Sequence, residues 1–184
     1  MDKIPGDVLR IRRLNNRSNI NNFCSVNDDL NNFLKDDALK AHADMTSITY
    51  ACSWKSVVVG FATLAAATIE VKQIEGARIE GYTPKTYPCI KLARLAVDKK
   101  YEGRGIGPYL LFWVMGKFEK ISREIGCRYL TVDSKRESIW FYQKYDFVLV
   151  ERTKNRPHPT FYLDMYLARE NNNKSISSYH SKNI

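Results

Sequence analysis

The chain has 184 residues, carries a formal net charge of +9, and is 44% apolar. A chain of this length and apolar content forms one domain, or one domain with an extension, which excludes a disordered protein. No apolar run reaches the roughly 20 residues that span a bilayer, and residues 1–5 lack the apolar stretch of a secretory signal. We therefore expect a cytoplasmic protein without membrane association, whose basic charge favours nucleic acid or another anionic partner.

The N-terminal third contains one strand and one helix. Residues 8–14 begin by alternating apolar and basic side chains, which predicts a strand, and the Asn-rich residues 15–22 predict a loop. Apolar residues then recur at spacings of three and four. They predict a helix that ends near residue 43 and has Ser25 or Asn27 as its N-cap.

Two strands are expected next, over residues 46–54 and 57–64, with a hairpin turn at Lys55 and Ser56. The second strand is nearly all apolar or small, which suits a central position in a sheet. Residues 70–88 contain two glycines and two prolines, and they predict a long irregular connection.

The middle of the chain combines a strand, a glycine-rich loop and a long helix. Residues 89–98 predict the strand, and residues 102–107 contain three glycines. Pro108 is expected to open the helix, where its missing N–H costs nothing, and Gly126 to end it.

The C-terminal part is expected to add three strands and a short helix. The complete order, β-α-β-β-β-α-β-α-β-β, predicts an α/β fold with a mixed sheet and helices on both faces. We expect a single domain over residues 1–167 and a polar, flexible tail over residues 168–184. The strands are expected at 129–133, 147–152 and 160–167, and the helix at 138–145.

The cysteines and histidines predict no metal site. No two cysteines form a C-x-x-C pair, and the three histidines have no ligand spacing relative to them. The cysteines are expected to be reduced and mostly buried. They are Cys24, Cys52, Cys89 and Cys127.

The glycine-rich loop predicts an anion-binding site. Glycines let the backbone approach a ligand closely, and the N–H groups at the start of a helix favour a phosphate. The loop lacks the Gly-Lys-Ser/Thr ending of a P-loop and the third glycine of the dinucleotide fingerprint. A tight turn that binds nothing remains the alternative at this stage.

The residues around this loop resemble the coenzyme A signature of the GNAT N-acetyltransferases. The resemblance rests on Leu-Ala-Arg-Leu-Ala-Val-Asp at 92–98 and Tyr-Glu-Gly-Arg-Gly-Ile-Gly at 101–107, although Glu102 stands where the family has Gln or Arg. A second match, Trp-Phe-Tyr-Gln-Lys-Tyr-Asp-Phe at 140–147, resembles the family's "FY…GF" ending, with Asp146 in place of glycine. Aspartate adopts the left-handed conformation at modest cost, so we expect this turn to form.

The resemblance implies acetyl-CoA as cofactor and assigns roles to individual residues. The backbone of Leu95, Ala96 and Val97 would bind the pantetheine as an added strand. Tyr142 would be the general acid for the leaving thiolate, the alternative being a core aromatic. The pyrophosphate would be held by Glu102, Gly103, Arg104, Gly105, Ile106, Gly107 and Pro108.

Residues 23–39 resemble a particular GNAT branch, the toxins of type II toxin–antitoxin pairs. Phe-Cys-Ser at 23–25, Leu-Asn-Asn-Phe-Leu at 30–34 and Ala-Leu at 38–39 carry this resemblance, while Val26 and Asn27 depart from the branch's glycine. It implies acetylation of the α-amine of aminoacyl-tRNA, an antitoxin partner and a homodimer. Two alternatives stay open: a GNAT acting on a small-molecule or protein amine, and a catalytically silent module that binds coenzyme A or nucleic acid.

The acceptor amine bears on which catalytic groups are needed. An α-amine has a pKa near 7.7–8.0, so a large fraction is neutral at pH 7 without a strong base. The candidate bases are Glu70, Glu75, Glu80 and Asp133.

The positive charge is concentrated near the coenzyme loop and beyond it. Residues 1–50 carry seven bases and seven acids, whereas residues 91–128 carry nine bases and four acids. Residues 135–169 carry seven bases and four acids. Cations that could follow an RNA backbone are Arg94, Lys99, Lys100, Arg104, Lys135, Arg136 and Arg156.

Overall fold

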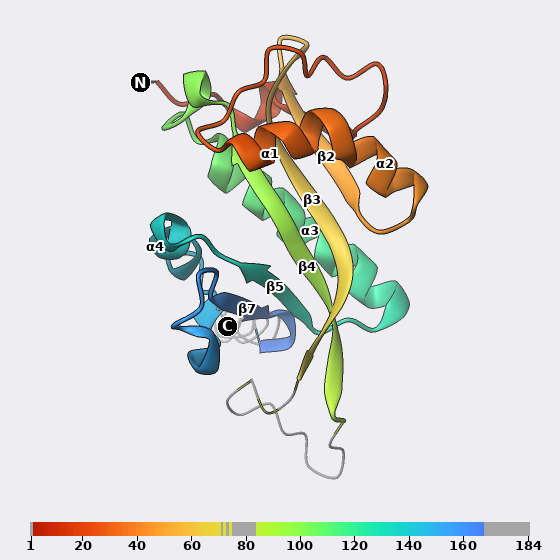
Figure 1. Cartoon of the computed structure of the whole chain (residues 1–184), viewed down its shortest axis with the longest axis vertical. Helices are drawn as coiled ribbons and strands as arrows, with labels where there is room; N and C mark the ends of the chain where they lie inside the picture. The colour runs from red at the N-terminus through yellow and green to blue at the C-terminus, as the bar shows by residue number, and fades with distance from the viewer. Residues whose placement is uncertain (1, 71, 73, 75–83, 168–184) are drawn as a thin grey trace, which may run out of the picture. The chain divides into compact units, whose positions relative to one another are not determined.

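The computed structural model describes residues 2–70, 72, 74 and 84–167, so the predicted tail at 168–184 lies outside the described residues (Figure 1). Its seven strands form one sheet in the order β1-β2-β3-β4-β5-β7-β6. Strands and helices follow one another as the sequence predicts, and the α/β fold class is confirmed. The strands are β1 Arg10–Arg13, β2 Ile48–Trp54, β3 Val57–Glu70, β4 Thr86–Val97, β5 Tyr129–Asp133, β6 Val148–Leu149 and β7 Thr160–Asp164.

The described α-helices have five or six residues, except for one that has 20. Within the described part of the chain, none is long and apolar enough to cross a membrane. The α-helices are α1 Asp28–Asn32, α2 Ala38–Ala43, α3 Ile106–Ile125 and α4 Ile139–Gln143. Short 3-10 turns are η1 Gly6–Val8, η4 Lys99–Tyr101, η5 Arg136–Ser138 and η6 Glu151–Thr153, and η2 Phe33–Asp37 is a π-helical turn.

The chain divides into two compact units, which are described separately below. The first unit consists of Met1–Ala66 and Lys91–Phe118, and the second of Ala67–Ile90 and Glu119–Ile184.

The first unit is built on the β2–β3 hairpin. Lys55 and Ser56 have φ angles of 48° and 63°, so both central turn residues are left-handed, as a type I′ turn requires. This confirms the predicted hairpin turn without the usual Asn-Gly pair. The strand after it continues past residue 64, where we expected it to end, as far as Glu70.

A β-bulge in this hairpin determines which β3 side chains face α3 and which face the other side of the sheet. Cys52 pairs with Gly60 and Ser53 pairs with Val58, so one residue of β3 is extra. As a result Val58 and Phe61 both join a core cluster with residues of α1 to α2. Gly60 instead faces α3, where an added Cβ would lie 2.9 Å from Leu110 Cδ1.

Helices therefore cover both faces of the sheet in the first unit, as expected. Figure 1 shows α1 and α2 on one side of β2, β3 and β4, with α3 on the other. Phe33, Leu34 and Ala38 are buried in the first of these layers. In the second layer the rings of Tyr50 and Trp113 lie 4.7 Å apart.

The predicted N-terminal helix is confirmed at its start and corrected in its middle. The Asn27 side chain accepts a hydrogen bond from Leu30 N at 3.1 Å and caps α1. The π-helical turn η2 then interrupts the expected continuous helix. Such a turn inserts one residue and rotates the following one, which brings Phe33, Leu34 and Ala38 into the core together.

The second unit contains two antiparallel pairings around β7. Tyr129 of β5 pairs with Asp164, and Val148 of β6 pairs with Tyr162. The Arg128 guanidinium donates two hydrogen bonds to Asp164 Oδ2, from Nη2 at 2.7 Å and from Nε at 3.1 Å, at the end of β7. The pairing of the last two strands was predicted.

Both strands are shorter than expected, for identifiable reasons. Thr153 Oγ1 donates to Val150 O at 2.7 Å and accepts from Thr160 N at 2.8 Å, which holds η6 where we expected a strand. Asp164 Oδ1 accepts from Tyr166 N at 3.0 Å and begins a helical turn in place of the last strand residues.

Four other predicted boundaries are wrong by a few residues. The first strand begins at Arg10 because Gly6–Val8 forms a 3-10 turn. Thr86–Pro88, expected to be irregular, belongs to β4. The helix predicted to open at Pro108 begins at Ile106. The helix predicted over 138–145 is α4, preceded by η5.

Candidate functional site

The end of β4 carries the three residues predicted to bind pantetheine. In the first unit, Ala96 is buried, and Leu95 and Val97 are half-buried. The strand ends at Val97, and the carboxylate of the next residue, Asp98, accepts hydrogen bonds from Cys24 N and Lys100 N, both at 2.9 Å. Asp98 is only 2% exposed, so these bonds fix the segment between strand and loop.

Sequence reasoning did not identify this role of Asp98. A signal was available, because aspartate directly after a strand and before a helical turn is a favoured N-cap.

The glycine-rich loop adopts a conformation that depends on its glycines. Gly103 and Gly105 have φ angles of 71° and 85°, in the left-handed region. Between them, Arg104 accepts a hydrogen bond from Ile4 N at 3.0 Å through its carbonyl and donates Nε to Asp2 O at 3.1 Å. Its guanidinium also lies 5.1 Å from the centre of the Trp54 ring. Arg104 therefore ties the loop to the N-terminal segment.

The start of α3 presents backbone donors. Tyr109 N donates to Gly105 O at 3.2 Å, which makes Gly105 the residue before the first helical one. The N–H groups of Gly105, Ile106 and Gly107 then have no acceptor within the helix, and Pro108 has no N–H to satisfy. Together with the helix dipole they form a site for an anion.

Two residues of the loop differ sharply in exposure. Ile106 is 1% exposed and packs in the core, so its side chain is not available to a ligand. Glu102, in the position where the family has Gln or Arg, is exposed to solvent.

Tyr142 lies in the second unit, on α4. Its side chain is 6% exposed, and its ring centre lies 5.2 Å from that of Phe141 and 5.6 Å from that of Phe147. Burial raises the pKa of the Tyr142 phenol well above its ordinary value. Among the described residues its hydroxyl has no hydrogen-bond partner. The phenol is therefore a neutral group that keeps its proton at pH 7.

The turn after Tyr142 is confirmed. Asp146 has a φ angle of 63° in the position where the family has glycine. The Tyr142 carbonyl accepts from Tyr145 N at 3.0 Å and from Phe147 N at 3.2 Å, which closes the helix.

The candidate cations differ in how available they are. In the first unit the Arg94 guanidinium lies 3.5 Å from the centre of the Phe33 ring, and burial lowers its pKa. Lys99 and Lys100 are exposed on η4. Arg94 therefore packs against Phe33 and is less available to a ligand, whereas the two lysines are open to solvent.

In the second unit the structure brings together two cations that are distant in sequence. Arg136 Nη2 donates to Lys154 O at 3.2 Å and to Arg156 O at 3.1 Å. Arg156 is exposed, and Lys135 is half-buried directly before η5.

The described candidate bases are engaged elsewhere. Glu70 Oε2 lies 2.9 Å from Lys72 Nζ and 3.7 Å from Arg152 Nη1. A hydrogen bond from Lys72 lowers the pKa of Glu70, which weakens it as a base. Asp133 Oδ1 accepts from Thr160 Oγ1 at 2.7 Å. Glu75 and Glu80 lie outside the described residues.

The cysteines are free thiols, and three of them are buried, as expected. Burial raises the pKa of Cys52 to about 12 and of Cys127 to about 11, so neither is a nucleophile at neutral pH. No group of three or more potential metal ligands occurs among the described residues.

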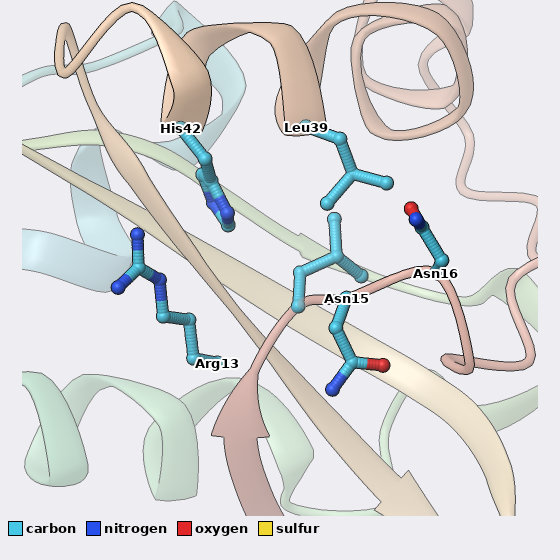
Figure 2. A pocket seen from close by; sticks show the side chains of 6 residues that line it. Arg13, Asn15, Asn16, Leu39 and His42 are labelled. Carbon is cyan, nitrogen blue, oxygen red and sulfur yellow. The ribbon is translucent and has the colours of Figure 1, made fainter.

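The first unit also has an open hollow of about 390 Å³ beside α2 (Figure 2). His42 and Arg13 lie at one side of it, with Leu39, Asn15 and Asn16 across from them. His42 Nε2 accepts a hydrogen bond from Thr49 N at 2.6 Å, so the imidazole links α2 to β2. None of the residues predicted to bind acetyl-CoA lines this hollow.

Known proteins resemble this chain over most of its length. A tRNA-acetylating toxin of Mycobacterium tuberculosis is 32% identical over 137 residues, which are 74% of this chain and 82% of that protein. The structure of AtaT complexed with acetyl-methionyl-tRNAfMet has a TM-score of 0.78 at 20% identity, covering 88% of this chain and 97% of that one. A mutant AtaT toxin bound to the C-terminus of the antitoxin AtaR and acetyl-CoA has a TM-score of 0.70 at 21% identity, covering 86% and 94%.

A family match covers both the glycine-rich loop and the turn after α4. The model of the acetyltransferase (GNAT) domain matches residues 25–165, which include both. The chain therefore belongs to the GNAT family of acetyltransferases.

Proposed function

We propose that this acetyltransferase transfers the acetyl group of acetyl-CoA to the α-amine of an aminoacyl-tRNA. The observation that carries the proposal is the 32% identity to a tRNA-acetylating toxin across 74% of the chain. The similarity in fold to AtaT, solved with acetyl-methionyl-tRNAfMet, supports it.

The first unit holds the cofactor in this proposal. The backbone of Leu95, Ala96 and Val97 pairs with the amides of pantetheine, and residues 102–108 surround the pyrophosphate. The donors are the N–H groups of Gly105, Ile106 and Gly107, which have no acceptor within the helix. Because these groups carry no formal charge, they need no counter-ion when no ligand is bound.

Tyr142 supplies the proton for the leaving group. The neutral amine attacks the acetyl carbonyl carbon, a C–N bond forms, and the C–S bond breaks as the tetrahedral intermediate collapses. The Tyr142 O–H donates to the departing sulfur, and the proton that the amine loses restores the phenol through solvent. A phenol whose pKa is raised by burial keeps this proton until the thiolate develops.

With this acceptor, the reaction does not require a dedicated general base among the described residues. An α-amine loses its own proton near pH 7.7–8.0, and an adjoining ester lowers that value further. Glu70, which pairs with Lys72 and Arg152, is then not required to remove a proton.

We further propose that residues 1–167 act as one acetyltransferase domain in the cytoplasm, where charged tRNA is found. The AtaT toxin bound to the antitoxin AtaR supports a small antitoxin as a partner. A gene for a short protein next to this gene would agree with that assignment.

Incubation with labelled acetyl-CoA and a set of charged tRNAs tests the main proposal. We expect label in an alkali-sensitive N-acetyl-aminoacyl-tRNA, and none with the same tRNAs after deacylation. Polyamines, aminoglycosides and peptides are assayed in parallel.

Two results would overturn the proposal. Rapid acetylation of a small amine with no transfer to any charged tRNA would assign the enzyme to small-molecule or protein amines. Binding of acetyl-CoA by calorimetry with no turnover on any amine would assign it as a silent module.

A further inference from the structure

Trp140 is a large aromatic side chain that the core does not use. It is 65% exposed, whereas its neighbour Tyr142 on the same short helix is 6% exposed. Two helical positions differ by about 200°, so the two rings point to nearly opposite sides of α4. Among the described residues, its ring contacts the Phe141 ring, edge-on, with 6.1 Å between the ring centres. One face of an indole is thus left in solvent in a part of the chain that carries excess positive charge.

Cations lie close to Trp140 along the chain. Arg136 belongs to the 3-10 turn η5, and Trp140 belongs to α4, which follows η5 directly, so little more than one helical turn separates the two residues. Arg136 also holds the backbone of Arg156 through its bond to Arg156 O, which brings that exposed side chain to the start of the same run. Arg136 and Arg156 are both exposed residues.

The acids nearby do not cancel this charge. Lys154 lies 3.4 Å from Glu151 and is paired with it. Glu137 and Asp146 are exposed and oppose four cations, which are Lys135, Arg136, Lys144 and Arg156. Arg136 uses only Nη2 for its two backbone bonds, so Nε and Nη1 keep three N–H donors.

We propose that Trp140 is a stacking platform for a nucleobase, and that Arg136 and Arg156 bind the phosphate next to that base. An exposed aromatic ring flanked by guanidiniums is the arrangement that binds nucleotides without reading their sequence, because every base has a flat face. Arginine suits the phosphate because its planar fork offers paired donors.

Two ligands of the proposed reaction contain this combination of base and phosphate. One is the acceptor RNA, and the other is the adenosine phosphate part of acetyl-CoA. The inference rests on the proposed function for this reason. Since Trp140 and Tyr142 lie on opposite sides of the helix, the platform binds a nucleotide and not the reacting amine.

The test compares Trp140→Ala with Trp140→Phe. Losing a stacked base costs about 1–3 kcal/mol, which is roughly a fivefold to hundredfold rise in KM for the ligand that stacks. We expect kcat to stay within about twofold, and Phe to restore most of the affinity, because it keeps a flat ring. Tyr166→Ala is the control: it removes an aromatic that is 54% exposed and contacts Arg128 instead.

Direct binding separates the two sources and does not depend on turnover. Acetyl-CoA binding is measured by calorimetry, and binding of uncharged tRNA by fluorescence anisotropy. A loss of affinity in Trp140→Ala for tRNA alone assigns the platform to RNA, and a loss for acetyl-CoA alone assigns it to the cofactor's adenosine. Unchanged affinity for both ligands, with a folded variant, overturns the inference. A wild type that binds tRNA but acetylates no charged tRNA would overturn the proposed function and leave the platform standing.

Discussion

At the scale of single residues, removing the Tyr142 hydroxyl is expected to lower kcat while leaving the free energy of unfolding nearly unchanged. Tyr142→Phe keeps the ring contacts with Phe141 and Phe147 and removes an oxygen that has no partner among the described residues. We expect kcat to fall by about 10²–10⁴, the usual contribution of a positioned acid, with little change in the unfolding free energy. Acetyl transfer under single-turnover conditions measures this.

Tyr145→Phe is the matched control, because Tyr145 is half-buried in the same turn and its ring lies 5.3 Å from Phe141. A Tyr142→Phe variant as fast as the wild type would assign Tyr142 to the core and not to the chemistry.

His42 predicts a dependence of stability on pH. Its Nε2 accepts the bond from Thr49 N, so this nitrogen is unprotonated in the folded protein. Burial first, and then the positive charge of Arg13, lowers the pKa of His42 from 6.5. The unfolded chain then binds the proton more readily, and the free energy of unfolding falls as the pH drops below about 6.5.

Urea denaturation at about pH 7.5 and about pH 5 measures this fall. His42→Gln can still accept the bond from Thr49 but does not titrate, so it should lose less stability over the same range. Equal losses in the two proteins would contradict the assignment to His42.

At the scale of elements, the junction between β4 and η4 depends on one carboxylate. Asp98→Ala removes a buried carboxylate and leaves the partly buried N–H groups of Cys24 and Lys100 without their acceptor, which costs about 1–3 kcal/mol. We also expect weaker acetyl-CoA binding, because the glycine loop follows directly. Urea denaturation and calorimetry measure the two effects. Asp98→Asn keeps one acceptor oxygen and should lie between the alanine variant and the wild type.

Gly60 of β3, which faces α3, and Gly116, an exposed residue of α3, test the packing of this helix on the sheet. In Gly60→Ala the new Cβ would lie 2.9 Å from Leu110 Cδ1 and 3.0 Å from Ala96 O, so we expect a loss of about 1–3 kcal/mol. Gly116 sits within α3 with nothing within 4 Å of an added Cβ. Gly116→Ala should therefore raise the unfolding free energy by up to about 1 kcal/mol. Equal effects of both changes in urea denaturation would contradict this packing.

Elements were predictable where the signal is local. Asn27 as a cap, the Lys55 and Ser56 turn and the left-handed Asp146 each depend on neighbouring residues, and all three are confirmed. The π-helical turn at Phe33–Asp37 was missed because it depends on burial against Phe61, which lies far along the chain. The early end of β6 depends likewise on the hydrogen bond between Thr153 and Thr160.

At the scale of the whole molecule, the order of strands and helices follows from periodicity alone. The role of the glycine loop needed the family resemblance as well, because an anion site and an empty tight turn have the same sequence pattern. Tertiary contacts such as the stacking of Arg94 on Phe33, or the hydrogen bond from Arg136 to Arg156 O, connect residues that are far apart in sequence. No spacing rule could have supplied them.

The distribution of charge predicts how RNA binding responds to salt. If cations such as Arg136 and Arg156 bind phosphates, the affinity for tRNA falls steeply as salt increases. Either alanine variant should lower the slope of log K against log salt by about one. Arg123→Ala is the control, since Arg123 pairs with Glu119 at 2.7 Å on α3. An unchanged slope in both alanine variants would show that Arg136 and Arg156 do not bind RNA phosphates.

The hydrogen bonds that tie the glycine loop to Asp2 and Ile4 have a consequence for a protein from which residues 1–4 are removed. A shortened product that starts after Ile4 would keep every strand and helix of the sheet. It would lose the two backbone partners of Arg104, so the loop that receives the pyrophosphate would be held less firmly. Such a protein would keep the folded sheet but bind acetyl-CoA more weakly than the full sequence, which calorimetry would measure.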